Sequence, residues 1–379
     1  MSRLIDHTLQ FDDIIDVVKR EHNQKRSFLF LNRYQAKYIP SNPNDTIVLF
    51  KRLAEQIKKQ YESQKIVVIG FAETATAIGV VTAQVLGTST YYIHTTREQY
   101  FQKKPLVIFE EEHSHASKHD LYCKDIEALS SAELILLIDD ELTTGKTVCN
   151  FVESLRQQQV VDKNAKFLVA SIVNCMNPQN LQQLQQKQID CMYLFHQQKH
   201  WDTWKWTKEY FSDTRPVDHI GDYQMLQIDG RIEIRQGSRI CDYLKACDKL
   251  ATLILQQCLL ECDDQSVLVL GTEECMYPAI YTAQQLTKKY SHLTVVTHAT
   301  SRSPILPMKQ KDYPIKNRSV LPSFYERDRI TYLYNLKQYH QVIIVTDSIE
   351  IPIQTIQACC SILRQYGNQK ITIVQWREI

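Results

Sequence analysis

The sequence predicts an α/β protein with two mostly parallel, Rossmann-like sheets. Short aliphatic strands alternate with longer stretches of helical periodicity along almost the whole chain. The strands are apolar on both faces, which is typical of parallel sheets covered by helices on both sides. This pattern occurs twice, so we expect two copies of one fold. The predicted strands span residues 65–70, 89–95, 133–140 and 165–173 in the first copy and 266–271, 293–300, 341–347 and 371–376 in the second.

The repeat is visible in three pairs of segments. VVIGFAETATAIGVVTAQVL (67–86) aligns with LVLGTEECMYPAIYTAQQL (268–286), YYIHTTRE (91–98) with VVTHATSR (295–302), and LILLIDDELTTGKTVCNFVESL (134–155) with VIIVTDSIEIPIQTIQACCSIL (342–363). The second copy has lost the acid pair and the Thr-Thr-Gly, so we expect it to be degenerate. We predict domains at 1–195 and 236–379, joined by a connector and hairpin at 196–235, with the hairpin turn at Asp229-Gly230.

Length and composition limit the function classes. The chain has 379 residues, 44% of them hydrophobic and 23% charged, which is typical of two folded domains. A net charge of +1 argues against a broad nucleic-acid surface. We see no apolar run near the roughly 20 residues of a membrane helix and no export signal, so we expect no membrane partner and a cytoplasmic location. None of the 11 cysteines is spaced C-x-x-C, which favours reduced thiols over disulfides or zinc.

The strongest functional signal lies at the end of the third strand. Asp139 and Asp140 stand where ligands bind in open α/β sheets, and adjacent carboxylates are best explained by a diol or metal-bound water that donates to both. The residues that follow are Thr143, Thr144, Gly145, Lys146 and Thr147. They open a helix whose backbone N–H groups suit a phosphate. The spacing is not that of a P-loop.

These residues resemble the signature of the type I phosphoribosyltransferases, an aliphatic strand followed by two acids and a Thr-Gly loop. The resemblance implies that Asp139 and Asp140 hold the ribose hydroxyls of phosphoribosyl pyrophosphate (PRPP). It implies that the loop from Thr143 to Thr147 holds the 5′-phosphate. Mg²⁺ would enter as cofactor with PRPP, with the two aspartates as candidate ligands.

The same resemblance assigns two further loops. Residues expected at the pyrophosphate are Phe71, Ala72, Glu73, Thr74 and Arg97. Residues expected in a catalytic lid, FEEEHSHASKHDLY (109–122), are Glu110, His113, His115 and His119. Two departures stand out: Glu73 replaces the Lys or Arg of many members, and Thr143 replaces an acid common in purine-using members. A general base would then be Glu141 or a lid histidine, or the acceptor needs none.

GFAETATAIG, FEEEHSHASKHDL, GTEECMYP and the segment Thr300 to Pro304 together resemble a narrower family. These are bacterial phosphoribosyltransferases with a C-terminal TRSP domain, encoded in tellurite-resistance and stress operons; here the namesake motif has an extra serine. The resemblance implies synthesis of a nucleoside-like metabolite. It also implies an N-terminal hood at 33–45, where Arg33 and Lys37 would meet phosphate or acceptor. Candidate residues of a second-domain site are Thr272, Glu273, Thr300, Ser301, Arg302 and Asp347.

Three hypotheses follow. The leading one is a Mg²⁺-dependent phosphoribosyltransferase that binds PRPP and an unidentified small-molecule acceptor, with a homodimer as one possible assembly. The second is a non-catalytic PRPP- or nucleotide-binding regulatory protein. The third is a PRPP-synthetase-like diphosphokinase, because those enzymes also pair two copies of this fold.

Overall fold

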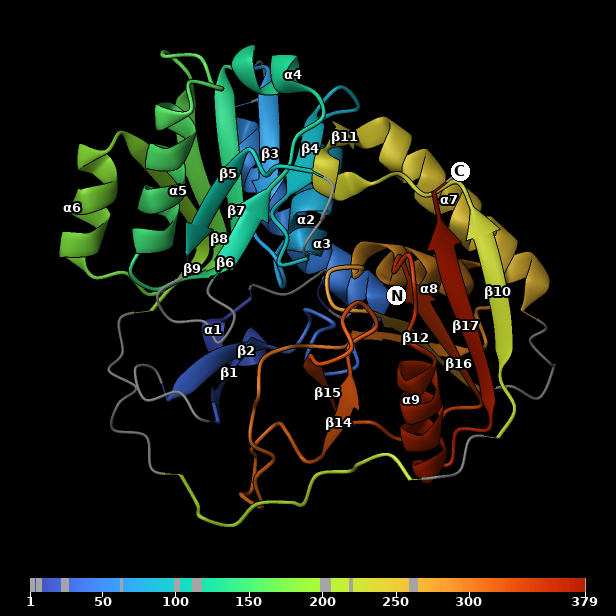
Figure 1. Ribbon diagram of the computed structural model, residues 1–379. Coiled ribbons are helices and arrows are strands. Elements are labelled where there is room, and N and C mark those ends of the chain that lie inside the picture. The colour runs from blue at the N-terminus through green and yellow to red at the C-terminus, as the bar shows by residue number, and fades with distance from the viewer. Residues whose placement is uncertain are drawn as a thin grey trace. The chain divides into compact units, whose positions relative to one another are not determined.

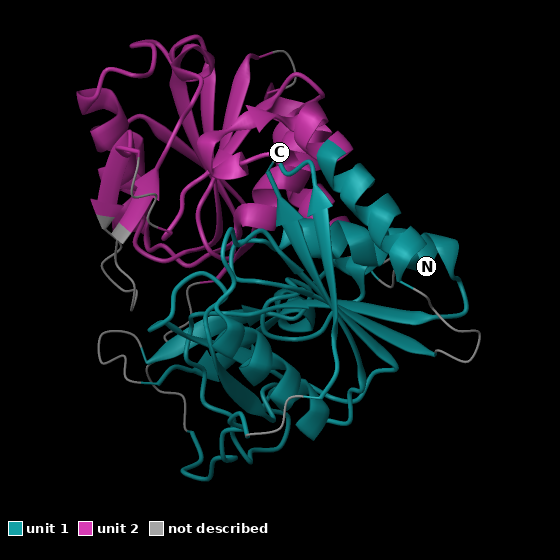
Figure 2. Ribbon diagram, turned by 45° about the vertical axis from the view of Figure 1, so that its right-hand side comes forward, with its two compact units in different colours: residues 1–46, 201–231, 246–379 teal, residues 47–200, 232–245 magenta. Residues whose placement is uncertain are grey.

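The computed structural model describes residues 4, 9–21, 27–61, 64–98, 103–110, 118–197, 206–217, 221–258 and 265–378. The chain divides into two compact units, shown in Figure 2. Unit 1 comprises residues 1–46, 201–231 and 246–379, and unit 2 comprises residues 47–200 and 232–245. Each unit is therefore assembled from discontinuous segments, and the domain boundaries at 195 and 236 stay a prediction.

Unit 2 contains a six-stranded sheet in the order β11-β4-β3-β7-β8-β9 (Figure 1). Its strands are β3 (Ile66–Gly70), β4 (Tyr91–His94), β7 (Leu134–Leu142), β8 (Lys166–Asn174), β9 (Ile189–His196) and β11 (Ser238–Arg239). Its helices are α3 (Thr76–Leu86), α4 (Ile126–Ser130), α5 (Lys146–Gln157) and α6 (Pro178–Gln186), with the 3₁₀ turn η2 (Ile234–Gln236). All pairs from β4 to β9 are parallel, and only β11 is antiparallel to its neighbour.

The strand order reverses between β3 and β7. From β3 the chain crosses through α3 to β4 on one side, and then continues through β7, β8 and β9 on the other. Because such crossovers are right-handed, α3 and α5 cover opposite faces of the sheet. The carboxyl ends of β3 and β7 therefore flank the point where the order reverses, which is where ligands bind in open α/β sheets.

Two glycines allow the first crossover to pack closely. A Cβ on Gly70 would lie 2.8 Å from the Tyr92 hydroxyl, and one on Gly79 would lie 2.7 Å from the Tyr92 ring. That hydroxyl donates a hydrogen bond to the carbonyl of Thr76 at 2.7 Å. The tyrosine of β4 thereby holds the start of α3 against the end of β3, and larger residues at either glycine would separate them.

Unit 1 contains a five-stranded, wholly parallel sheet in the order β10-β17-β16-β12-β13. Its strands are β10 (Gln224–Asp229), β12 (Ser266–Gly271), β13 (Thr294–Ala299), β16 (Gln341–Thr346) and β17 (Lys370–Arg377). Two antiparallel pairs accompany the sheet, β1 (Ile15–Lys19) with β2 (Phe28–Asn32) and β14 (Arg318–Pro322) with β15 (Ile330–Tyr334). Helices α1 (Phe11–Ile14), α8 (Tyr277–Lys289) and α9 (Ile353–Gln365) belong to this unit. Two more helices, α2 (Pro43–Tyr61) and α7 (Ile240–Gln257), cross the segment boundaries at residues 46 and 245.

The prediction of two α/β copies with mostly parallel sheets is confirmed. Strands β4-β3-β7-β8 of unit 2 follow the same order as β13-β12-β16-β17 of unit 1. Each copy also inserts an antiparallel pair between its second and third strands, β5 (Val107–Glu110) with β6 (Lys118–Leu121) in the first and β14 with β15 in the second. The predicted hairpin at Asp229-Gly230 is wrong, because β10 ends there and pairs in parallel with β17.

The strand registers correct the alignment of the two copies. Gly70 pairs with His94 and Gly271 with Ala299, so Arg97 corresponds to Arg302, one position away from the letter-by-letter match. In the same way Gly70 pairs with Ile138 and Gly271 with Val345. The second aspartate of the acid pair, Asp140, therefore corresponds to Asp347.

Candidate active site

The acid pair lies on the part of β7 that extends beyond β3. Strand β3 ends at Gly70 beside Ile138, whereas β7 continues through Leu142. Asp139 and Asp140 occupy the first two positions of this overhang, and both side chains are half-buried. They therefore lie at the carboxyl edge of the sheet and keep some access to solvent.

A hydrogen bond joins the acid pair to the loop after β3. The Thr74 hydroxyl donates to Asp140 Oδ1 at 2.7 Å, across 66 positions of sequence. The Asp140 N–H donates to Asp139 Oδ1 at 2.9 Å, which orients the first carboxylate. The sequence predicted both segments as parts of one site, and the fold brings them into direct contact.

The loop from Thr143 to Thr147 opens helix α5. Gly145 precedes the helix with φ of 71°, a left-handed conformation that glycine adopts without strain. A Cβ at this position would lie 2.9 Å from Met176 Sδ. The first-turn N–H groups of a helix have no partners within it and carry the positive end of its dipole. The threonines of this loop are half-buried and Lys146 is exposed, and the Lys146 N–H donates to the Thr144 hydroxyl at 3.4 Å.

In the loop after β3, two residues predicted to bind pyrophosphate, Phe71 and Ala72, make contacts within the protein. The Phe71 ring is buried and packs against Phe109 and Phe151, with ring centroids 5.7 and 5.3 Å away. The Ala72 N–H donates to Thr95 Oγ1 at 2.9 Å. Glu73 is 5% exposed. The roles of Phe71, Ala72 and Glu73 at a pyrophosphate stay predictions.

Thr95, which directly follows β4, is a residue beside this loop that sequence reasoning missed. Its N–H donates to the Gly70 carbonyl at 3.0 Å, while its hydroxyl accepts from Ala72, so it fixes the loop to the end of β4. Thr300 makes the same pair of contacts in the second copy, to the Gly271 carbonyl and the Glu273 N–H. A threonine one position beyond the second strand of both copies is the signal that could have found it.

Arg97 and His119 form a pair. Arg97 Nε donates to His119 Nε2 at 3.1 Å, and His119 Nδ1 lies 3.4 Å from the Thr95 hydroxyl. The imidazole stacks on Phe109 and is 2% exposed. His119 thus belongs to strand β6 and not to a loop, and it connects Arg97 to the loop after β3. Glu110 lies on β5, and His113 and His115 fall outside the described residues.

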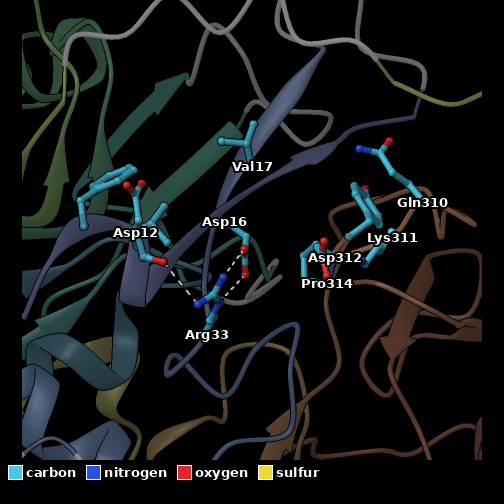
Figure 3. Close-up of a pocket in the computed structure, with 11 residues that line it drawn as sticks. Asp12, Asp16, Val17, Arg33, Gln310, Lys311, Asp312 and Pro314 are labelled. Atoms are coloured by element: carbon cyan, nitrogen blue, oxygen red, sulfur yellow. Dashed lines mark hydrogen bonds and ion pairs between the residues drawn. The ribbon is translucent and has the colours of Figure 1, made fainter.

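The proposed hood residues make their described contacts within unit 1. Arg33 forms a two-pronged ion pair with Asp16, with both N–O distances 2.6 Å, and this bond raises the pKa of Arg33. Figure 3 shows this pair on the wall of a cavity of about 260 Å³, which residues 310–314 also line. Lys37 is buried, and its Nζ donates to the Glu273 carbonyl at 2.8 Å. Their contact with a phosphate or acceptor stays a prediction.

The second-copy candidates at the ends of β12 and β16, Thr272 and Asp347, are linked through Tyr325. Thr272 Oγ1 donates to Thr346 Oγ1 at 2.9 Å across the point where the strand order reverses. Asp347 accepts a hydrogen bond of 2.5 Å from the Tyr325 hydroxyl, which also lies 3.1 Å from the Thr272 carbonyl. These polar residues form a network within the fold.

A second cluster surrounds Glu273, whose side chain is wholly buried. Its Oε2 lies 2.6 Å from Arg302 Nε and 2.9 Å from Arg329 Nη1. Its Oε1 accepts a hydrogen bond of 2.5 Å from Ser323. Burial raises the pKa of this carboxyl, but the charges of the two arginines and the serine hydrogen bond outweigh it and lower the pKa. Ser301 lies beside these residues in sequence and pairs with Tyr332 of β15.

The described residues set limits on other kinds of site. They contain no group of three His, Cys, Asp or Glu side chains that could hold a metal ion by themselves. Within the same residues, no helix has the length and apolarity needed to cross a membrane. The cytoplasmic location stays a prediction.

Two family models match the chain. One is described as phosphoribosyl transferase and matches residues 14–197, and the other is the TRSP domain found C-terminal to it and matches residues 235–359. No curated protein matches the chain.

Solved structures with similarity include adenine phosphoribosyltransferases from Giardia lamblia and Trypanosoma brucei and an orotate phosphoribosyltransferase from Aeropyrum pernix. Their identities are 12%, 13% and 13%, and their TM-scores 0.37, 0.36 and 0.30. The matches cover 50%, 49% and 48% of this chain and 96%, 77% and 87% of those chains. At such TM-scores these likenesses carry no conclusion about this chain. The two family matches together do carry one: the chain belongs to the phosphoribosyl transferases with a C-terminal TRSP domain.

Proposed function

We propose that the chain is a PRPP-dependent phosphoribosyltransferase that ribosylates a small acceptor still to be identified. The hydrogen bond between Thr74 and Asp140 carries this proposal, because it joins the loop after β3 to the acid pair. The phosphate loop opened by Gly145 follows the same strand. In this proposal the acid pair binds a diol, the helix start binds an anion and the polar loop lies beside them, all at the carboxyl ends of the strands where their order reverses.

Each group has a role suited to one part of PRPP. The carboxylates of Asp139 and Asp140 accept hydrogen bonds from the two ribose hydroxyls. The N–H groups and hydroxyls from Thr143 to Thr147 bind the 5′-phosphate at the start of α5. Arg97, oriented by His119, donates to the pyrophosphate, for which a guanidinium has matching geometry.

The reaction requires little covalent help from the protein. The bond between ribose C1 and the pyrophosphate oxygen breaks, and an acceptor atom bonds to C1 from the opposite face, which inverts its configuration. Pyrophosphate leaves with the bonding electrons, and a proton on the acceptor passes to a base or to water. The contribution of the chain is to position the two reactants and to stabilise charge on the leaving group.

The residues present fit a Mg²⁺ ion that arrives with PRPP. Carboxylate oxygens are the ligands Mg²⁺ prefers, and Asp139 and Asp140 are half-buried at the carboxyl edge of the sheet. The described residues offer no complete protein cage, so PRPP oxygens and water would supply the remaining ligands. When bound, the ion would offset the negative charge of the leaving pyrophosphate.

The product class follows from the family resemblance. Within this proposal, the product is a nucleoside-like metabolite made in the cytoplasm as part of tellurite or stress resistance. Thr143, in place of the acid common in purine-using members, favours an acceptor other than a salvaged purine.

Calorimetric titration with PRPP and Mg²⁺ tests the proposal. An Asp139→Asn/Asp140→Asn variant loses two hydrogen bonds to charged groups, each about 1.5–3 kcal/mol, so PRPP should bind more than a hundredfold more weakly. A Glu55→Gln/Glu127→Gln variant removes two exposed charges from the same unit and should bind normally.

The outcomes separate the hypotheses. Loss of binding only in the aspartate variant would justify a screen of acceptors for pyrophosphate release. Binding of PRPP without pyrophosphate release for any acceptor would favour the regulatory protein. If the intact protein binds no PRPP, the transferase proposal fails. Formation of PRPP from ribose 5-phosphate and ATP would instead indicate the diphosphokinase.

A further inference from the structure

The two copies make the same backbone contacts around the loop after their first sheet strand. Ala72 and Glu273 each donate their N–H to the threonine that follows the next strand, at 2.9 and 2.8 Å. Each of those threonines, Thr95 and Thr300, returns its own N–H to the glycine at the strand end, at 3.0 and 3.1 Å. Ala72 and Glu273 are therefore structural counterparts.

The arginine that follows is also shared. Thr96 pairs with Asp120 of β6, and Ser301 pairs with Tyr332 of β15, in each case through two backbone hydrogen bonds. The next residue is Arg97 in the first copy and Arg302 in the second. The same arginine therefore stands one position past a shared anchor to the inserted hairpin.

The copies differ in what the Nε of this arginine meets. In the first copy Arg97 Nε donates to an imidazole nitrogen, His119 Nε2. In the second, Arg302 Nε donates to the carboxylate of Glu273 at 2.6 Å. Ala72, at the corresponding position of the first copy, has no side-chain acceptor. Within unit 1, an anion supplied by the loop itself thus occupies the arginine.

The Glu273 carboxylate also holds the hairpin loop of its copy. Ser323 and Arg329 come from the segment between β14 and β15, and both bind this carboxylate. Lys37 adds a third cation at the Glu273 carbonyl. A wholly buried anion with two arginines and a hydroxyl around it has the surroundings of a bound phosphate oxygen. Glu273 keeps this arrangement at φ of 45°, which is uncommon outside glycine.

We propose that the Glu273 carboxylate takes the place of a pyrophosphate in the second copy, holding its arginines and its hairpin closed and preventing that copy from binding PRPP. The comparison with the first copy rests on the proposed function, in which Arg97 meets pyrophosphate. It assigns Ala72 a specificity role, because alanine has no carboxylate that could take the place of the ligand's anion beside Arg97. The chain then takes one PRPP, bound in unit 2.

Removing the carboxylate should turn the second copy into an anion site. Glu273→Gly removes the side chain and suits the positive φ, and Glu273→Gln keeps the shape without the charge. Melting temperatures of the wild type and both variants would be followed against inorganic pyrophosphate, with sodium chloride at matched ionic strength as control. We expect Glu273→Gly to be the least stable of the three proteins. At a pyrophosphate concentration one hundred times the Kd of this variant, its melting temperature should rise by about 5 °C more than that of the other two. Binding to unit 2 is common to all three proteins and cancels in this comparison.

Three results would overturn the proposal. They are an equal response of all three proteins to pyrophosphate, a Glu273→Gly chain that stays unfolded at every pyrophosphate concentration, and a titration showing two PRPP molecules per wild-type chain. A wild type that binds no PRPP refutes the proposed function instead. The pyrophosphate rescue of Glu273→Gly then still decides whether this carboxylate stands in for an anion.

Discussion

The Thr74–Asp140 hydrogen bond provides the sharpest test of how the site is assembled. Thr74→Val keeps the shape of the side chain and removes the hydroxyl that donates to Asp140 Oδ1 at 2.7 Å. Without this bond the carboxylate can rotate, so it is no longer oriented toward the ribose. A hydrogen bond to a charged group is worth about 1.5–3 kcal/mol, and half-burial of Asp140 favours the lower value. We therefore expect PRPP to bind about tenfold more weakly.

The assay is calorimetric titration of PRPP with Mg²⁺ on a double-mutant cycle. The cycle comprises the wild type, Thr74→Val, Asp140→Asn and the double variant. Because the threonine acts through the aspartate, the double variant should bind nearly as well as Asp140→Asn alone. Thr88→Val, which changes an exposed threonine of the same unit, serves as control and should bind normally.

Two results would refute this reasoning. Affinity of Thr74→Val within twofold of the wild type would mean that the bond does not order the site. Additive losses in the double variant would mean that Thr74 acts on PRPP independently of Asp140.

Three further predictions concern stability, each measured by urea unfolding. Gly145→Ala should cost about 1–2 kcal/mol, because φ is 71° and the new Cβ would press on Met176; an unchanged midpoint would contradict this. Arg318→Met should cost about 3 kcal/mol, because the carboxylate of Glu21 loses this cation and that of Asp213, now 2.7 Å from Arg318 Nε, keeps only Arg215 at 3.8 Å; sensitivity of the wild-type pair to salt would argue against this value. Burial lowers the pKa of His298 to about 4, so the folded state binds fewer protons than the unfolded chain, whose histidine titrates near 6.5. Stability should therefore fall by about 2 kcal/mol from pH 7 to pH 5, and His298→Gln should remove most of this dependence.

The sequence by itself determined the fold class, the repeat and the position of the acid pair. These features are local: strands such as residues 134–138 are aliphatic throughout, and the Thr-Thr-Gly after Asp140 demands a turn into a helix whatever surrounds it. Parallel strands bring their carboxyl ends to one edge of the sheet. Polar residues that directly follow different predicted strands are therefore expected at the same edge. The point of strand reversal between β3 and β7 followed once the order of strands was known.

Only the tertiary structure decided which residues meet. Matching the letters of the two copies puts Arg97 beside Ser301, and strand register shifts it to Arg302, because register is set by packing between strands distant in sequence. The Thr74–Asp140 bond, the His119 contact with Arg97 and the burial of Glu273 between two arginines depend on pairings of the same kind. A sequence shows that a carboxylate follows a strand. Whether that carboxylate is available to a ligand or is bound by side chains of its own chain depends on which cations the fold brings within about 3 Å of it.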